Sequence, residues 1–240
     1  MWLAAALGVA AILYSSVGHG GASAYLGLMA LFSVAPDTMR STALTLNLLV
    51  SGLALVRFGF ARQINARLVA MLAVTAAPAA FVGGMIVLPG HYYKPLVGLV
   101  LLFAAARLIW QPVAASASSI TPPPASRVLP TGLVIGLLAG LTGTGGGIFL
   151  SPLLILCRWE EPRRASGVAA GFVFINSLAG LAGNYAALRS LPAELPWLLA
   201  SVGLGALVGT WLGVEKLPRR RILQSLGCVL IIAGLKLIFT

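Results

Sequence analysis

Hydrophobic residues form eight long stretches along the chain, and the stretches are of two kinds. Six of them run without interruption for 19 to 24 residues, at 41–60, 66–88, 92–111, 165–188, 196–214 and 219–239. An α-helix of about 20 apolar residues crosses the roughly 30 Å hydrocarbon core of a bilayer. Each of the six stretches therefore predicts one transmembrane helix.

The other two stretches, residues 2–34 and 129–157, are longer but are interrupted by glycines. Residues 18–21 read GHGG and residues 143–147 read GTGGG. These interruptions leave halves of about 14 to 16 residues, which are too short to span a bilayer comfortably. Both stretches predict helices that break in the middle.

The composition is typical of a membrane protein. Of 240 residues, 59% are hydrophobic and 9% are charged, with a mean hydropathy of +0.99. Soluble domains have about 45–50% apolar and about 25% charged residues. The Lys and Arg residues that give the net charge of +11 lie between apolar stretches. Positive residues at such places commonly set the orientation of a protein in the bilayer, so we expect no nucleic-acid partner.

The two halves of the chain repeat each other. The glycine motifs at 18–21 and 143–146 are offset by 125 residues, and Asn47 and Asn176 by 129. Residues 107–110 (RLIW) match residues 236–239 (KLIF), also at an offset of 129. We therefore divide the chain into a first transmembrane repeat (1–111), a linker rich in Pro, Ser and Ala (112–128) and a second transmembrane repeat (129–240).

Loop charge indicates how the repeats are oriented. If each broken stretch enters and leaves the membrane on the same side, twelve Lys and Arg residues fall on one side of the membrane and four on the other. If both broken stretches cross the membrane, the same residues divide into nine and seven. The four are Arg40, Lys94, Arg189 and Lys236. Because positive charge collects in cytoplasmic loops, the first arrangement is favoured. The predicted fold is an all-α membrane protein of two inverted repeats, each with one re-entrant helical hairpin and three transmembrane helices, in the bacterial inner membrane.

Small and aromatic residues have structural interpretations in this fold. Glycines 52, 83, 84, 180, 183, 205 and 209 are expected where helices pack closely. Aromatic residues near the ends of stretches are expected as interfacial anchors: Tyr92, Tyr93, Trp110, Trp159 and Trp197.

The two breaks predict an anion-binding site. A helix that starts at a break presents unpaired N–H groups and the positive end of its dipole toward the membrane interior. Nearby hydroxyl groups add donors, so the site needs no buried cationic side chain. The predicted substrate-binding residues are Ser16, Gly18, His19, Gly20, Gly21, Ser23, Asn47, Thr142, Gly143, Thr144, Gly145, Gly146 and Asn176.

Two kinds of residue in this set allow other interpretations. His19 either contacts the substrate or changes its protonation state during transport, or it hydrogen-bonds a carbonyl that the break leaves free. Asn47 and Asn176 either bind substrate or hold helices together. All five acidic residues lie at stretch ends or in loops. We therefore expect no intramembrane cation site, no metal, no cofactor and no enzymatic acid–base pair.

The motifs SSVGHGGASAYL and GLTGTGGGIFLSPLL, repeated in the two halves and each followed by a span with an asparagine, resemble the TauE/SafE family of sulfite and organosulfonate exporters. The resemblance covers nearly the whole chain. It implies secondary transport of small sulfur-containing anions such as sulfite, an organosulfonate or thiosulfate, with proton or sodium coupling. A passive anion channel of the same fold is the alternative. Substrate, direction, coupling ion and oligomeric state stay open.

Overall fold

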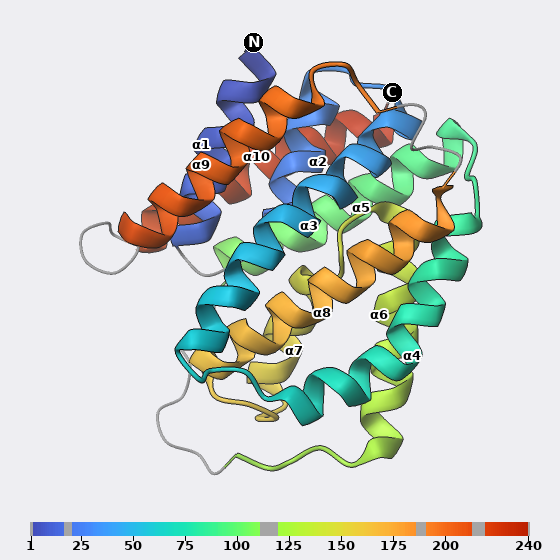
Figure 1. Cartoon of the computed structure of the whole chain (residues 1–240). Coiled ribbons are helices and arrows are strands. Elements are labelled where there is room, and N and C mark those ends of the chain that lie inside the picture. The colour runs from blue at the N-terminus through green and yellow to red at the C-terminus, as the bar shows by residue number, and fades with distance from the viewer. Residues whose placement is uncertain (1, 17–20, 111–119, 186–190, 213–218, 240) are drawn as a thin grey trace.

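The computed structural model describes residues 2–16, 21–110, 120–185, 191–212 and 219–239, and this part of the chain contains helices and no strand (Figure 1). The helices are α1 (Trp2–Ser16), α2 (Ala22–Leu31), α3 (Pro36–Phe60), α4 (Ala66–Met85), α5 (Gly90–Ile109), α6 (Ala125–Thr142), α7 (Gly147–Leu156), α8 (Pro162–Gly183), α9 (Leu195–Leu212) and α10 (Arg219–Phe239).

All six uninterrupted stretches form helices, namely α3, α4, α5, α8, α9 and α10. Within the described residues, five helical segments are long and apolar enough to cross a membrane: α3, α4, α5, α6 and Arg164–Gly183 of α8. Shorter apolar segments occur in α9 and α10, at Leu195–Gly209 and Leu226–Phe239. The structure therefore confirms an all-helical protein with several helices of transmembrane length.

Both interrupted stretches form pairs of helices, α1 with α2 and α6 with α7. The expected length was wrong for α6, which has 18 residues and is long enough to span. It begins at Ala125, directly after an extended Pro124, because proline cannot continue a hydrogen-bonded helix but is tolerated before its first turn. Residues 125–128, expected in the linker, consequently belong to α6.

Helices of one half pack mainly against helices of the other half. Helix α4 of the first half packs along α6 of the second half. By their order in the repeats, α9 corresponds to α4 and α1 corresponds to α6, and these two helices also pack along each other. Helix α5 packs along its own equivalent α10, and α3 along its equivalent α8. The two halves are therefore interleaved and not two separate bundles.

Helices α3 and α8 lie side by side in opposite directions (Figure 1). Near the start of α8, Gly167 approaches the Gln63 backbone, just beyond the end of α3. Near its end, Gly180 approaches Leu44 in the first half of α3, at 3.6 Å from a Cβ placed on the glycine. The chain directions of these two equivalent helices are thus opposed.

Glycines allow the closest helix pairs to form. Gly132, Gly136 and Gly140 recur every four residues on α6, and a Cβ on each would overlap the carbonyl oxygens of α4 at Leu72, Ala76 and Ala80. The α1–α9 pair has the same kind of contact at Gly205 and Gly209. The predicted close packing of Gly83, Gly84, Gly183, Gly205 and Gly209 is confirmed.

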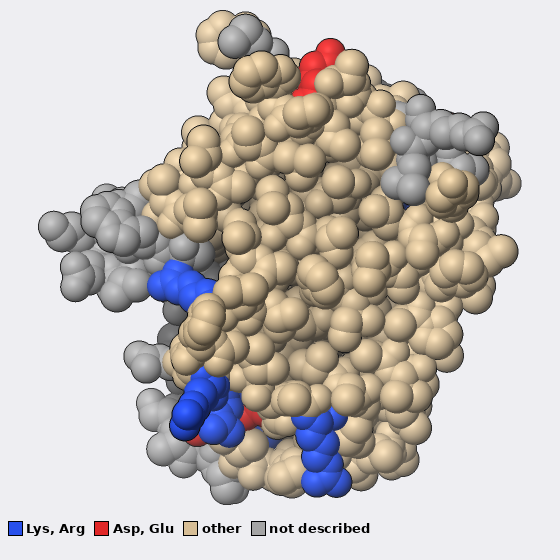
Figure 2. Space-filling view, in the orientation of Figure 1, with Lys and Arg blue, Asp and Glu red and all other residues tan. Residues whose placement is uncertain are grey.

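One end of the molecule collects the turns that carry arginines. The Asn65 side chain caps α4 and also donates from Nδ2 to Glu160 Oε2 at 2.6 Å, joining the α3–α4 turn to the α7–α8 turn. The Thr121 N–H, ahead of α6, donates to the Arg158 carbonyl, after α7, at 3.0 Å. Figure 2 shows exposed Lys and Arg side chains gathered toward the lower end of this face.

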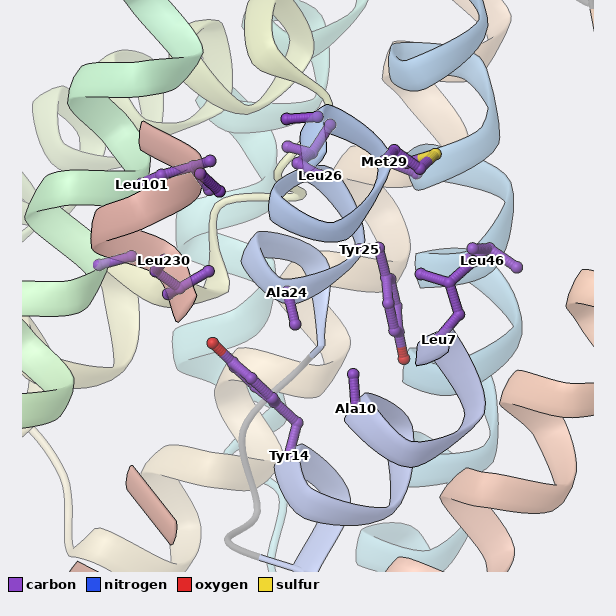
Figure 3. Close-up of a cluster of buried hydrophobic side chains, with 14 of the residues drawn as sticks. Leu7, Ala10, Tyr14, Ala24, Tyr25, Leu26, Met29, Leu46, Leu101 and Leu230 are labelled. Carbon is purple, nitrogen blue, oxygen red and sulfur yellow. The ribbon is translucent and has the colours of Figure 1, made fainter. Parts of the chain in front are cut away.

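Buried apolar side chains form two clusters. The larger one joins α1, α2, α5, α9 and α10 with one side of α3, and part of it is shown in Figure 3. The second joins α4, α6, α7 and α8. One cluster therefore contains the helix pair α1 and α2, and the other contains the pair α6 and α7.

Candidate anion site at the helix breaks

Backbone conformations that glycine favours form the α6–α7 break, residues 143–146. Gly143 ends α6 with φ +83°, Gly145 has φ +68°, and Gly146 precedes α7 with φ +83°. Such positive φ angles are rare for residues with a Cβ. No side chain caps the start of α7, so N–H groups of its first turn stay available to a ligand. The break is buried inside the protein.

The two predicted threonine hydroxyls are used within the break. Thr142 and Thr144 are both fully buried. Thr142 Oγ1 donates to the Leu138 carbonyl at 2.6 Å and accepts from Thr144 Oγ1 at 2.9 Å. Their protons therefore stabilise the turn of the chain after α6.

Asn47 brings the first half of the chain to the break in the second half. Its side chain, 2% exposed, donates from Nδ2 to the Gly143 carbonyl at 3.2 Å. A Cβ on Gly145 would lie 3.3 Å from Asn47 Nδ2, 3.0 Å from Ser177 Oγ and 2.9 Å from Val173 Cγ1. Helices α3 and α8 thus place an amide and a hydroxyl group against the same glycine.

Asn176 and Ser177 are buried polar residues whose side chains have no hydrogen-bond partner within the part of the chain that the structure describes. Both are 0% exposed, and the unpaired atoms are Nδ2 and Oδ1 of Asn176 and Oγ of Ser177. A buried polar atom without a partner costs about 1–3 kcal/mol. A hydrogen-bonding ligand at the break, such as an anion, would satisfy the Ser177 hydroxyl, which lies against Gly145.

The comparison with known proteins identifies the family. Residues 3–237 match the sequence profile of the family described as Sulfite exporter TauE/SafE. The chain belongs to this family. It is 36% identical to a probable membrane transporter protein of Sinorhizobium fredii over 240 aligned residues. The alignment covers 99% of this chain and 97% of that protein. No solved structure matches the chain. This TauE/SafE protein is accordingly a multi-pass membrane transporter.

The structure corrects the expectation that Arg40 of this TauE/SafE transporter lies in a loop. Its side chain on α3 is 5% exposed. Nε donates to the Gly140 carbonyl at 2.9 Å and Nη1 to the Ile86 carbonyl at 2.8 Å, while Nη2 donates to the Gly83 carbonyl. Arg40 thereby satisfies carbonyl groups at the C-terminal ends of α4 and α6.

The charge count assigned Arg40 to a loop because it directly precedes the apolar stretch 41–60. The signal for an earlier helix start is present in the sequence. Pro36 occupies the first turn of α3 and Asp37 follows it, a combination typical of helix N-termini. Starting the helix there places Arg40 one turn inside it.

Two of the five aromatic residues expected as interfacial anchors are buried instead. Tyr93 is 3% exposed, and its hydroxyl donates to the Thr142 carbonyl at 3.0 Å, so it supports the α6–α7 break. Trp159 is 6% exposed and belongs to the second apolar cluster. Tyr92, Trp110 and Trp197 are exposed, in agreement with the expectation.

In the first half of the TauE/SafE transporter, α1 ends at Ser16 and α2 begins after Gly21. Gly18, His19 and Gly20 lie outside the described residues, as does the side chain of Ser16. Ser23 is 1% exposed, and its Oγ lies 3.1 Å from the Tyr14 hydroxyl. The described part thus brings Asn47 and Gly143–Gly146 together, with Ser177 as a further member that the sequence did not indicate.

Proposed function

We propose that the protein is a secondary transporter of small sulfur-containing anions, such as sulfite, an organosulfonate or thiosulfate. One observation carries the proposal. Asn176 and Ser177 are fully buried, have no partner in the described structure and lie on α8, with Ser177 against Gly145 of the α6–α7 break. Membership of a family of sulfite exporters gives the class of substrate.

The chemistry of the donors suits an oxyanion. The second N–H of the Asn47 amide, the Asn176 amide, the Ser177 hydroxyl and the first N–H groups of α7 are neutral donors. The positive end of the α7 dipole adds attraction for negative charge without a salt bridge. The Arg40 guanidinium is directed at carbonyl groups. Binding through neutral donors leaves the anion free to dissociate on either side.

Two inverted repeats, each with a re-entrant hairpin, are part of the proposal. The hydrogen bond from Thr121 to Arg158 joins the start of α6 to the end of α7, as a hairpin that enters and leaves on one side requires. The opposed directions of α3 and α8 and the exchanged pairs α4–α6 and α9–α1 support the inversion. We place the arginine-rich end in the cytoplasm of a bacterium.

The same correspondence extends the proposed site to the first half. Asn47 donates to Gly143, and the residues equivalent to this pair in the other half are Asn176 and Gly18. We propose that Asn176 serves the first glycine motif as Asn47 serves the second. Alternating access would then expose the anion, held between the two motifs, first to one side and then to the other.

A ligand screen and one pair of variants test the site. Sulfite, sulfate, thiosulfate, sulfoacetate and taurine are compared with carboxylate controls by the thermal unfolding of the purified protein, because a bound ligand raises the unfolding temperature. Gly145→Val should abolish the shift, since valine disfavours φ +68° and its methyl groups fill the space beside Asn47 and Ser177.

The control is Gly59→Val, at an exposed position near the end of α3 where the nearest atom to a Cβ is 3.8 Å away. It should keep the shift. An unchanged shift in Gly145→Val would place the anion elsewhere. Flux in proteoliposomes separates transport from a channel: a transporter saturates and follows a proton or sodium gradient, whereas a channel gives uncoupled flux that follows the voltage.

A further inference from the structure

The N-terminal turn of α2 offers backbone donors that no side chain caps. Gly21 is the residue before the helix, and the first helical bond runs from the Tyr25 N–H to the Gly21 carbonyl at 3.0 Å. The N–H groups of Ala22, Ser23 and Ala24 precede this first helical donor and therefore have no acceptor within the helix. The turn is buried, so these groups depend on protein or ligand acceptors.

The hydroxyl group of Tyr25 lies beside Gly21, at this N-terminal turn of α2. Tyr25 follows Gly21 by one helical turn, and its side chain points back toward the N-terminus, as long helical side chains do. A Cβ on Gly21 would lie 2.5 Å from both Cζ and the hydroxyl oxygen of Tyr25. Only a residue without a side chain leaves room for the phenol at this position.

The Tyr25 hydroxyl is buried without a hydrogen-bond partner in the described part of the chain. The residue is 0% exposed and the oxygen is unpaired. Tyr14, from α1 in the same apolar cluster, is 2% exposed, but its hydroxyl lies 3.1 Å from Ser23 Oγ. Figure 3 shows the two rings on opposite sides of the start of α2. Phenylalanine would fill the space of Tyr25 equally well, so packing does not account for its hydroxyl.

We propose that the Tyr25 hydroxyl binds the transported anion, donating a hydrogen bond to one of its oxygens at the N-terminus of α2. The inference rests on the proposed function and adds a residue that selects the substrate. At the offset of 125 that relates the glycine motifs, Leu150 corresponds to Tyr25. The phenol is therefore a donor at the start of α2 without a counterpart at the start of α7, and it distinguishes ligands with an acceptor oxygen at that end.

The matched variants are Tyr25→Phe and Tyr14→Phe, which remove one hydroxyl each from two buried rings. Sulfite is the probe, and its Kd is obtained from the shift in unfolding temperature over a concentration series. A hydrogen bond to a charged ligand contributes about 1.5–3 kcal/mol, so Tyr25→Phe should weaken sulfite binding at least tenfold. Tyr14→Phe should change the Kd by less than twofold, because Ser23 already pairs with that hydroxyl.

The unfolding temperature without ligand serves as the control for correct folding. It should be equal to or higher than that of the parent protein in Tyr25→Phe, because an unpaired hydroxyl is removed. A second variant, Gly21→Ala, should also weaken sulfite binding, since its methyl group displaces the hydroxyl, and should have little further effect when Tyr25 is phenylalanine. Equal sulfite affinity of Tyr25→Phe and the parent protein overturns this inference alone. If no oxyanion stabilises the parent protein, the proposed function fails with it.

Discussion

Polar side chains of the proposed site are of two kinds, those with a hydrogen-bond partner in the described structure and those without one. Asn47, Tyr93 and Arg40 donate to carbonyl groups of the break or of the helix ends beside it. Asn176 and Ser177, equally buried, have no partner in the described structure. The satisfied residues hold the shape of the break, and the unsatisfied ones are those on which a ligand can act.

Leucine substitutions at the two asparagines should separate these roles. Asn176→Leu removes unpaired polar atoms and should raise the stability of the ligand-free protein while abolishing anion binding. Asn47→Leu leaves the Gly143 carbonyl without its donor and should lower stability by about 1–3 kcal/mol. Thermal unfolding with and without sulfite measures both effects. A loss of stability in Asn176→Leu equal to that in Asn47→Leu would contradict the assignment.

The sequence predicted some residues of the site better than others. Asn47 was predicted because an asparagine recurs in both halves within an apolar stretch, and the glycines because they interrupt one. Arg40 and Tyr93 were missed because their burial depends on where helices begin and on which neighbours cover them. Ser177 gave no signal, since serine is common in membrane helices.

At the scale of helices, the α4–α6 pair depends on backbone contact. Gly132, Gly136 and Gly140 lie on one face of α6 and bring its backbone against carbonyl oxygens of α4. Hydropathy predicted both helices, but it did not predict that α4 pairs with α6 from the other half. An apolar stretch shows that a helix is surrounded by lipid or protein, and it does not specify which helix is the neighbour.

Gly136→Val should therefore disrupt this pair. The added methyl groups would collide with the Ala76 backbone, which cannot move away as a flexible side chain could. Overpacking of this kind costs about 1–3 kcal/mol, and more where backbone must shift. The midpoint of unfolding in detergent should fall well below that of Gly59→Val. Equal midpoints for the two variants would show that the α4–α6 contact is looser than described.

At the scale of the molecule, the two apolar clusters define two packed bodies. One contains α1, α2, α5, α9 and α10 and the other α4, α6, α7 and α8, with α3 against α8 between them. Polar bonds from Arg40, Asn47 and Tyr93 connect the first body and α3 to the second. In the alternating access proposed above, one of these bodies would move against the other.

The orientation proposed for the molecule can be tested with single cysteines. Cys157 and Cys228, both free and exposed, are first replaced by serine. A cysteine at His91, exposed at the start of α5, should then react with an impermeant thiol reagent added outside intact cells. A cysteine at Ala61, exposed in the arginine-rich turn after α3, should react only after the cells are opened. The reverse pattern would invert the protein in the membrane.

The exchange of helices between halves bears on how such a chain could have arisen. Half of the chain alone would leave the counterparts of α4 and α6 without the partners they have here, since each finds its partner in the other half. An ancestral protein of half this length would have met the same packing requirement only by pairing two copies of itself in opposite orientations. A gene duplication would have fixed the opposite orientations proposed here and left each copy free to diverge. The present difference between a tyrosine after the first glycine motif and a leucine after the second is one that two identical subunits could not have maintained.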